Sequence, residues 1–149
     1  MSRKKKEQTG KGEKIKKIVV TGKRKTAVAK ATIAPGTGKI TLNNKTIQNF
    51  NNFHKLTISE PLEIAKPFLG EELNKIDIVV SILGGGAESQ IEAARLAIAR
   101  ALLNFTKNSE LRNAFLKYDR ALLVADTRRK EQRKPNDSKA RAKRQKSYR

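Results

Sequence analysis

The side chains of this chain that could do chemistry are cations, and most of them lie in a few segments. Residues 22–26 place Lys23, Arg24 and Lys25 side by side, and residues 126–149 carry 11 Lys and Arg against 3 acids. Ammonium and guanidinium groups bind phosphate oxygens, and Arg does so bidentately. A turn holding three cations is either a solvated hairpin tip or a rigid group set against a phosphate backbone. The charge around it favours the second interpretation.

Three consecutive glycines, Gly84, Gly85 and Gly86, follow an apolar run and precede an amphipathic segment. A glycine-rich turn before a helix can bind phosphate, because the first N–H groups of the helix point outward. The segment matches neither G-x-x-x-x-G-K-[ST] nor G-x-G-x-x-G, which argues against a nucleotide site. Two interpretations stay open: a tight turn that needs positive φ, and the same turn in contact with an RNA phosphate.

Residues for catalysis or metal binding are scarce. The chain has no Cys and one His, His54, and it shows no Ser/His/Asp or paired-Glu arrangement. We interpret His54 as a polar loop residue, Asp77 as the start of a strand and Glu88 as the start of a helix. The sequence therefore predicts no enzyme activity, cofactor, metal site or small-molecule substrate.

The elements that position the cations follow from how charge is distributed. Residues 1–30 carry a net charge of +10 and residues 126–149 a net charge of +8, whereas residues 31–125 carry only +2 of the total of +20. We expect three parts: a basic N-terminal extension (1–17), a globular domain (18–125) and a basic C-terminal tail (126–149). The two basic ends are expected to become ordered on a polyanion. A solubility tail is the alternative. A membrane-surface segment would need apolar side chains, and residues 126–149 contain no Leu, Ile, Val, Phe or Trp.

The first part of the globular segment predicts strands. β-branched residues at 18–20, alternation at 26–34 and the run at 39–42 are separated by Gly-, Pro- and Asn-containing turns, so we expect an antiparallel meander. Within the second strand Ala27, Ala29 and Ala31 predict a closely packed face, and Lys30 lies on the opposite one.

The second part predicts helices around one more strand. A weak helical pattern within 45–70 suggests Ser59 as N-cap and Pro61 in the first turn. The apolar run 76–83 predicts a central strand buried on both faces. Helices are expected at 87–105, with Arg100 away from the apolar face, and at 109–118, before an apolar anchor at 121–124. The expected fold is α+β, a small sheet covered by helices.

Three blocks then resemble a known family. They are GKRKTAVAKA (22–31), GGGAESQIEAARLAIARAL (84–102) and DTRRKEQRKPNDSKARAKRQKSYR (126–149). In order and spacing they are similar to the universal small-subunit ribosomal protein nine, and the ending QKSYR is similar to its archaeal and eukaryotic form. Asn136 stands near the position of the family's usual glycine, and Asn tolerates left-handed φ.

The resemblance implies a fold, a function and a set of contact residues. The fold is of the ribosomal protein S5 domain 2-like kind. The function is structural: the protein binds rRNA in the head of the small subunit of a cytoplasmic ribosome, beside other head proteins, and its tail extends toward the anticodon loop of P-site tRNA. The implied rRNA-binding residues are Lys23, Arg24, Lys25, Lys30, Gly84, Gly85, Gly86, Arg100, Arg128, Arg129, Lys130, Arg133, Lys134, Lys139, Arg141, Lys143, Arg144 and Lys146, and the implied tRNA-binding residues are Ser147, Tyr148 and Arg149.

Two other functions remain as rivals. Composition alone permits an architectural DNA-binding protein. The glycine-rich turn, with a fold that the family shares with some kinases, suggests a nucleotide-dependent enzyme, although fold analogy does not establish function.

Overall fold

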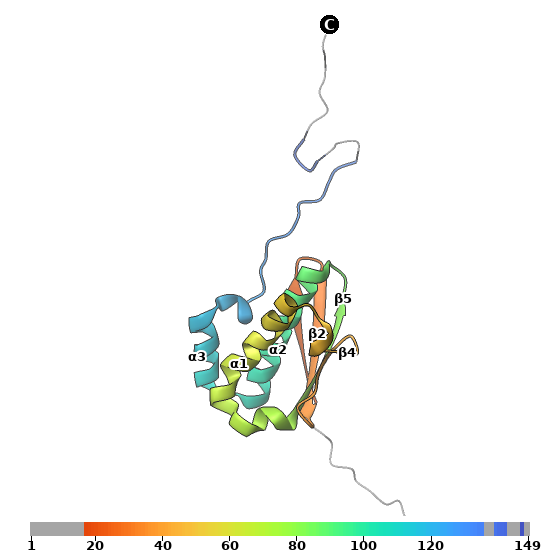
Figure 1. The fold of residues 1–149 in the computed structure, drawn as a ribbon. Helices are drawn as coiled ribbons and strands as arrows, with labels where there is room; N and C mark the ends of the chain where they lie inside the picture. Colours follow the sequence, from red (N-terminus) through yellow and green to blue (C-terminus); the bar gives the residue numbers. More distant parts are fainter. Residues whose placement is uncertain (1–16, 136–138, 143–146, 148–149) are drawn as a thin grey trace, which may run out of the picture.

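The computed structural model describes residues 17–135, 139–142 and 147, and the expectations for residues 1–16 and for Asn136, Lys143, Arg144, Lys146, Tyr148 and Arg149 lie outside that part. A five-stranded mixed sheet in the order β1-β2-β5-β3-β4 carries its helices on one face, so the α+β prediction is confirmed (Figure 1). The strands are β1 (Ile18–Arg24), β2 (Ala27–Pro35), β3 (Ile40–Leu42), β4 (Lys45–Thr46) and β5 (Ile76–Leu83). The helices are α1 (Asn52–Leu69), α2 (Ala87–Thr106) and α3 (Ser109–Tyr118), with short 3₁₀ turns η1 (Ile47–Asn49), η2 (Gly70–Lys75) and η3 (Arg120–Leu122).

The first two strands of the expected antiparallel meander are confirmed, because β1 pairs antiparallel with β2, but the predicted pairing of the third strand is wrong. β5 lies between β2 and β3, antiparallel to β2 and parallel to β3, where Ile40 pairs with Ile78. The carboxylate of Asp77 in β5 holds the turn after β2. It accepts hydrogen bonds from the backbone N–H groups of Thr37 (2.7 Å) and Lys39 (2.9 Å), so the segment before β3 is fixed against β5.

β1 is longer than expected, because Gly22 lies inside the strand and does not interrupt it. A Cβ atom at Gly22 would lie 2.3 Å from the carbonyl oxygen of Ala93, so only glycine allows α2 to approach β1 this closely. The turn is Lys25-Thr26, with Lys25 at φ 51°. The closely packed alanine face is confirmed, since Ala27, Ala29 and Ala31 are all 0% exposed.

β5 has the predicted bounds, but it is not buried on both faces. Its side chains alternate: Ile78 and Val80 are buried, whereas Val79 is 50% and Leu83 71% exposed. The reason is that the helices cover only one side of the sheet, so the outward positions of a continuous apolar run stay open.

α1 begins well before the predicted start. Ser59 is no N-cap, because its hydroxyl donates to the carbonyl of Lys55 (2.8 Å) within the helix, and Pro61 is a buried residue of the helix interior. His54 is helical too, with Nε2 2.9 Å from a carboxylate oxygen of Glu88, so the loop interpretation is wrong. The helices expected at 87–105 and 109–118 are confirmed to within one residue. The apolar anchor is confirmed at Leu122, which is 0% exposed.

Candidate nucleic-acid interface

The sheet has an open face, which we define by the outward-pointing residues of its strands. Val19, Thr32, Val79 and Thr41 lie in register in one row across four strands, and Thr21, Lys30 and Ser81 form the next row. Lys23 and Lys30 are exposed on this face. It therefore presents hydroxyls, short apolar side chains and cations.

Carboxylates are almost absent from the sheet. Asp77 is the single acid in the five strands of the described part, and two backbone N–H groups occupy it. These hydrogen bonds, that of Lys39 first, lower the pKa of Asp77 below its usual value. Little uncompensated negative charge therefore remains on this side of the molecule.

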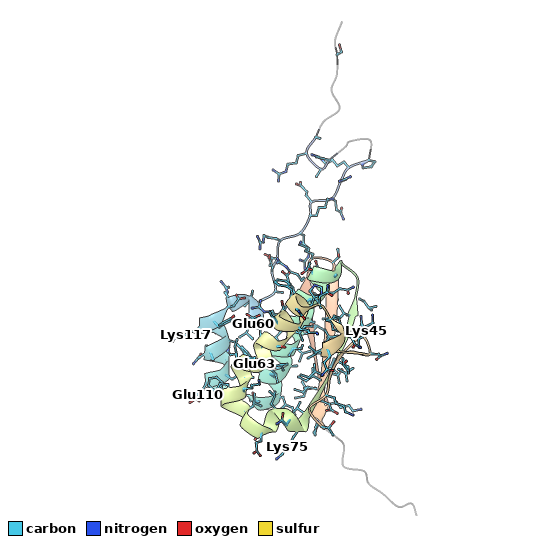
Figure 2. All side chains as sticks on the ribbon, in the orientation of Figure 1. Lys45, Glu60, Glu63, Lys75, Glu110 and Lys117 are labelled. Atoms are coloured by element: carbon cyan, nitrogen blue, oxygen red, sulfur yellow. The ribbon has the colours of Figure 1, made fainter. Side chains whose placement is uncertain are left out.

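The helical layer carries the acids of the body. Of the nine acids between residues 31 and 125, all except Asp77 lie in α1, η2, α2, α3 or at Asp119. Figure 2 shows Glu60 and Glu63 on α1 and Glu110 on α3, while Lys45 lies at the sheet. These acids are balanced by the Lys and Arg of the same elements, whereas the cations of the sheet face a single acid, so a polyanion is attracted more to the sheet and to the end from which the tail leaves.

Two predicted segments meet at one end of the sheet. A Cβ atom at Gly84 would lie 2.7 Å from the carbonyl oxygen of Thr26, and one at Gly85 would lie 2.8 Å from Cβ of Ala27. The glycine-rich turn therefore packs directly on the turn that holds Lys25. Gly84 and Gly85 have φ of 73° and 71°, which supports the tight-turn interpretation for them.

Gly86 differs from the other two glycines of the turn. Its φ is −95°, no atom lies within 4 Å of a Cβ built there, and it is the N-cap of α2 without any side-chain cap. The first N–H groups of α2 accordingly lack a capping side chain. A helix start of this kind, beside the turn that holds the exposed Lys25, suits an anion, and the first turn of α2 also carries the acid Glu88.

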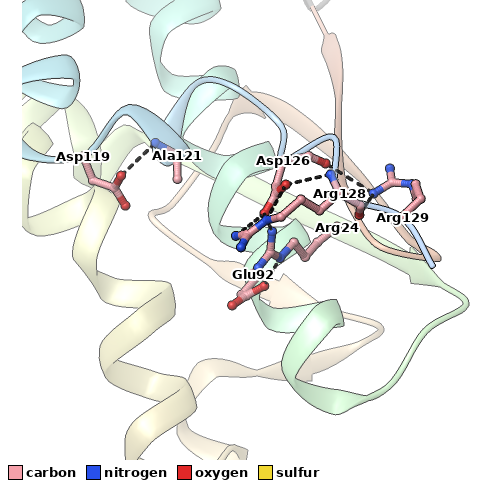
Figure 3. Close-up of polar contacts among 7 residues, drawn as sticks. All are labelled: Arg24, Glu92, Asp119, Ala121, Asp126, Arg128 and Arg129. Atoms are coloured by element: carbon pink, nitrogen blue, oxygen red, sulfur yellow. Dashed lines mark hydrogen bonds and ion pairs between the residues drawn. The ribbon is translucent and has the colours of Figure 1, made fainter. Parts of the chain in front are cut away.

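The tail leaves the body at the same end. The guanidinium of Arg24, the last residue of β1, forms ion pairs with Glu92 on α2 and with Asp126, the first residue of the tail (Figure 3). These contacts, that with Asp126 first, raise the pKa of Arg24. β1, α2 and the tail are thereby joined at one point.

Comparison with known proteins places the chain. A model of the family "Ribosomal protein S9/S16" matches residues 22–149. The chain belongs to this ribosomal protein family. The sequence is 45% identical over 138 residues to "Small ribosomal subunit protein uS9" of Methanococcus vannielii, and 44% identical to that of Methanococcus maripaludis strain C7. Each alignment covers 91% of this chain and 100% of the relative, so the resemblance predicted from the three blocks is confirmed.

Of the body residues implied by the family resemblance, Arg24 and Arg100 are engaged within the chain. Arg24 is shared between two carboxylates. Arg100 donates from Nε to the carbonyl of Leu123 (2.8 Å) and from Nη1 to the carbonyl of Thr21 (3.0 Å). The structure thus places both in contacts that join the S9/S16 body to the root of its tail. Lys23, Lys25 and Lys30 are exposed.

The described tail of this S9/S16 protein runs away from the body (Figure 1). Arg128 pairs with Asp126, and Arg141 with Glu131 (3.0 Å). The other predicted contact residues of the described tail are exposed: Arg129, Lys130, Arg133, Lys134, Lys139 and Ser147.

Within the part of the chain that the structure describes, none of the helices has the length and apolarity needed to cross a membrane.

Sequence reasoning missed the carboxylates of this region. Glu92 and Asp126 were not singled out, yet both bind Arg24. The available signal was an isolated acid at the boundary between a neutral body and a strongly basic tail. A carboxylate there opposes phosphate binding unless it has a partner within the protein.

Proposed function

We propose that this chain is a structural component of the small ribosomal subunit whose body docks on folded rRNA in the head. Its basic tail then extends along RNA toward the anticodon loop of P-site tRNA. The observation that carries the proposal is the convergence of the Lys25 turn, the Gly84–Gly86 turn and the root of a basic tail at one end of a sheet. The excess of cations over acids on the sheet, against balanced charges on the helical layer, favours the sheet side for a polyanion.

Docking of the body works through charge and fixed geometry. Lys23 and Lys25 neutralise phosphates and release their counterions. The start of α2 at Gly86 offers backbone N–H groups to a further phosphate. These contacts carry no base sequence, so the shape of the folded RNA decides where the body binds.

The tail contributes most of the remaining positive charge. The cations of the tail bind RNA phosphates, and released counterions and ion pairs offset the chain entropy that is lost on binding. By the family resemblance, Ser147, Tyr148 and Arg149 reach the tRNA, and Tyr148 is suited to stack on an unpaired base. The role is positioning, and the proposal includes no chemical step.

The body contacts are tested by neutralising lysines on the two sides of the molecule. Lys23→Gln/Lys25→Gln removes two cations from the proposed interface. Lys107→Gln/Lys117→Gln removes two exposed cations from the helical layer, and it is a matched control because Lys107 has φ 53° where Lys25 has φ 51°. Affinity for a folded rRNA head fragment is measured in a salt series with the full chain.

The first variant should lower affinity at every salt concentration and reduce the slope of log K against log salt by about 2, roughly one per lost phosphate contact. The control should leave the slope within about 0.5 of the original protein. Equal losses in both variants would contradict docking through this end of the sheet. An affinity for duplex DNA as high as the affinity for the rRNA fragment would favour the architectural DNA-binding alternative.

The tail contact is tested separately by removing residues 147–149. Small subunits containing the shortened chain should assemble normally but lose P-site tRNA faster. Unchanged tRNA retention would remove the tRNA contact from the proposal and leave docking of the body intact.

A further inference from the structure

Four side chains form what we call the clasp: Arg24, Glu92, Asp126 and Arg128 (Figure 3). Arg24 bridges Glu92 and Asp126. Arg128 closes back on Asp126 with Nη2 at 2.7 Å and Nε at 2.9 Å from Oδ2, and its backbone N–H donates to Oδ1 at 2.8 Å. One carboxylate therefore receives donors from the end of β1 and from the tail itself.

The clasp has an inner and an outer half. The side chains of Arg24 and Asp126 are only 23% and 19% exposed, whereas that of Arg128 is 85% exposed. The donors around it, those of Arg128 first, hold the pKa of Asp126 well below its usual range. The inner pair is screened less by salt than a surface pair and stays charged at neutral pH.

The chain leading to the clasp is fixed residue by residue. The carboxylate of Asp119 accepts from the N–H of Ala121 (2.8 Å), Leu122 lies in the core, and Arg100 binds the carbonyl of Leu123. Asp126 is the last of these attachments. From residue 127 to residue 135 every residue is exposed.

We propose that Arg24 and Asp126 are positioning residues that set where, and in which direction, the basic tail leaves the body. This role accounts for the pairing of Arg24, beside the proposed RNA-binding turn, with two carboxylates that weaken its attraction for phosphate. The pairing fixes the direction of the first tail residues before RNA binds, so less conformational entropy is lost on binding. The benefit for RNA binding rests on the proposed function, but the fixed direction of the tail is a property of the free protein.

Distances between two spin labels on the free, full-length protein measure that aim. The chain contains no Cys, so Lys117→Cys on α3 and Lys130→Cys on the tail give two defined attachment points. The proposal expects a narrow distance distribution at low salt. A broad distribution at low salt would overturn it without any further variant.

Variants then separate aiming from stability. Asp126→Asn and Arg24→Gln should each broaden the distribution. The double variant should be no broader than either, because each single variant already removes the Arg24–Asp126 ion pair. Asp126→Glu keeps the carboxylate and should retain the narrow distribution. Glu131→Gln is the matched control, since it makes the same carboxylate-to-amide change in the tail, and it should leave the width unchanged. Arg24→Lys keeps the charge but loses the fork, and it should give an intermediate width even if another variant fails to fold.

Two results would overturn the assignment. One is a lower melting temperature of Asp126→Asn with an unchanged distance distribution, which marks a purely structural pair. The other is equal broadening by Glu131→Gln, which marks a general charge effect. Neither result bears on rRNA docking, which the lysine variants of the body test independently.

Discussion

Gly22→Ala tests how closely β1 and α2 approach, and therefore what holds Lys23 and Arg24 in place. The added Cβ atom would lie 2.3 Å from the carbonyl oxygen of Ala93 and 2.7 Å from the backbone nitrogen of Ala97. Both are backbone atoms of a helix, so neither can rotate aside. The helix or the strand must move by about 1 Å to restore ordinary contact.

The size of the effect follows from that movement. Overpacking a core costs about 1–3 kcal/mol, and a gap of 0.5–1 Å forfeits about a quarter to a half of the dispersion energy of the contacts it opens. Alanine recovers roughly 0.5–1 kcal/mol as the better strand residue. We expect a net loss of about 1–2 kcal/mol. At roughly 4 °C per kcal/mol for a chain of this size, the melting temperature should fall by about 4–8 °C.

Thermal unfolding followed by circular dichroism measures the change. Gly86→Ala is the matched control, because no atom lies within 4 Å of its Cβ position and its φ is not positive. It should change the melting temperature by no more than about 3 °C. A Gly22→Ala protein that melts no lower than this control would refute the packing argument.

Three further predictions concern caps and charge. Asn108→Ala should lower the free energy of unfolding by about 1 kcal/mol in urea titrations, because its side chain accepts the N–H of Glu110 at the start of α3. Asp77→Asn should lower the melting temperature at neutral pH. Because the pKa of folded Asp77 lies below its usual value, that stabilisation is present above about pH 4 and is lost as the pH falls further, so the two melting curves should converge in acid. Gly86→Asp should raise the melting temperature by capping α2 yet weaken binding to the rRNA fragment; stronger binding would contradict phosphate contact there.

The elements whose signals are local could be predicted from the sequence. α2 and α3 follow from their 3.6-residue apolar period and from polar residues at their starts. α1 was harder, because its prolines suggested a boundary at Pro61, whereas the packing of its buried face carries the helix through that residue. The bounds of β5 were predictable from Gly84, but its one-sided burial depends on where the helices lie.

The pairing of strands and the assembly of the site could not be predicted in the same way. β2 pairs with β5, and the turn between β2 and β3 is held by Asp77, a carboxylate that is distant in sequence from the groups it binds. The cations themselves were visible as clusters. Their arrangement was not, because Arg24 and Asp126 are 102 residues apart and nothing in the sequence indicates that Arg24 and Arg100 bind groups of the protein itself.

The contact between Arg100 and the carbonyl of Thr21 also affects how the chain behaves before it reaches its partner. β1 is the outermost strand on one side of the sheet, and unpaired backbone groups on such a strand can recruit a strand from another molecule. Arg100 occupies one acceptor there, and the exposed Lys23 places a charge on the same strand. The opposite border, β4, is only two residues long. We therefore expect that free copies of the protein resist pairing through their edge strands, which is a common route to aggregation in proteins with open sheet edges.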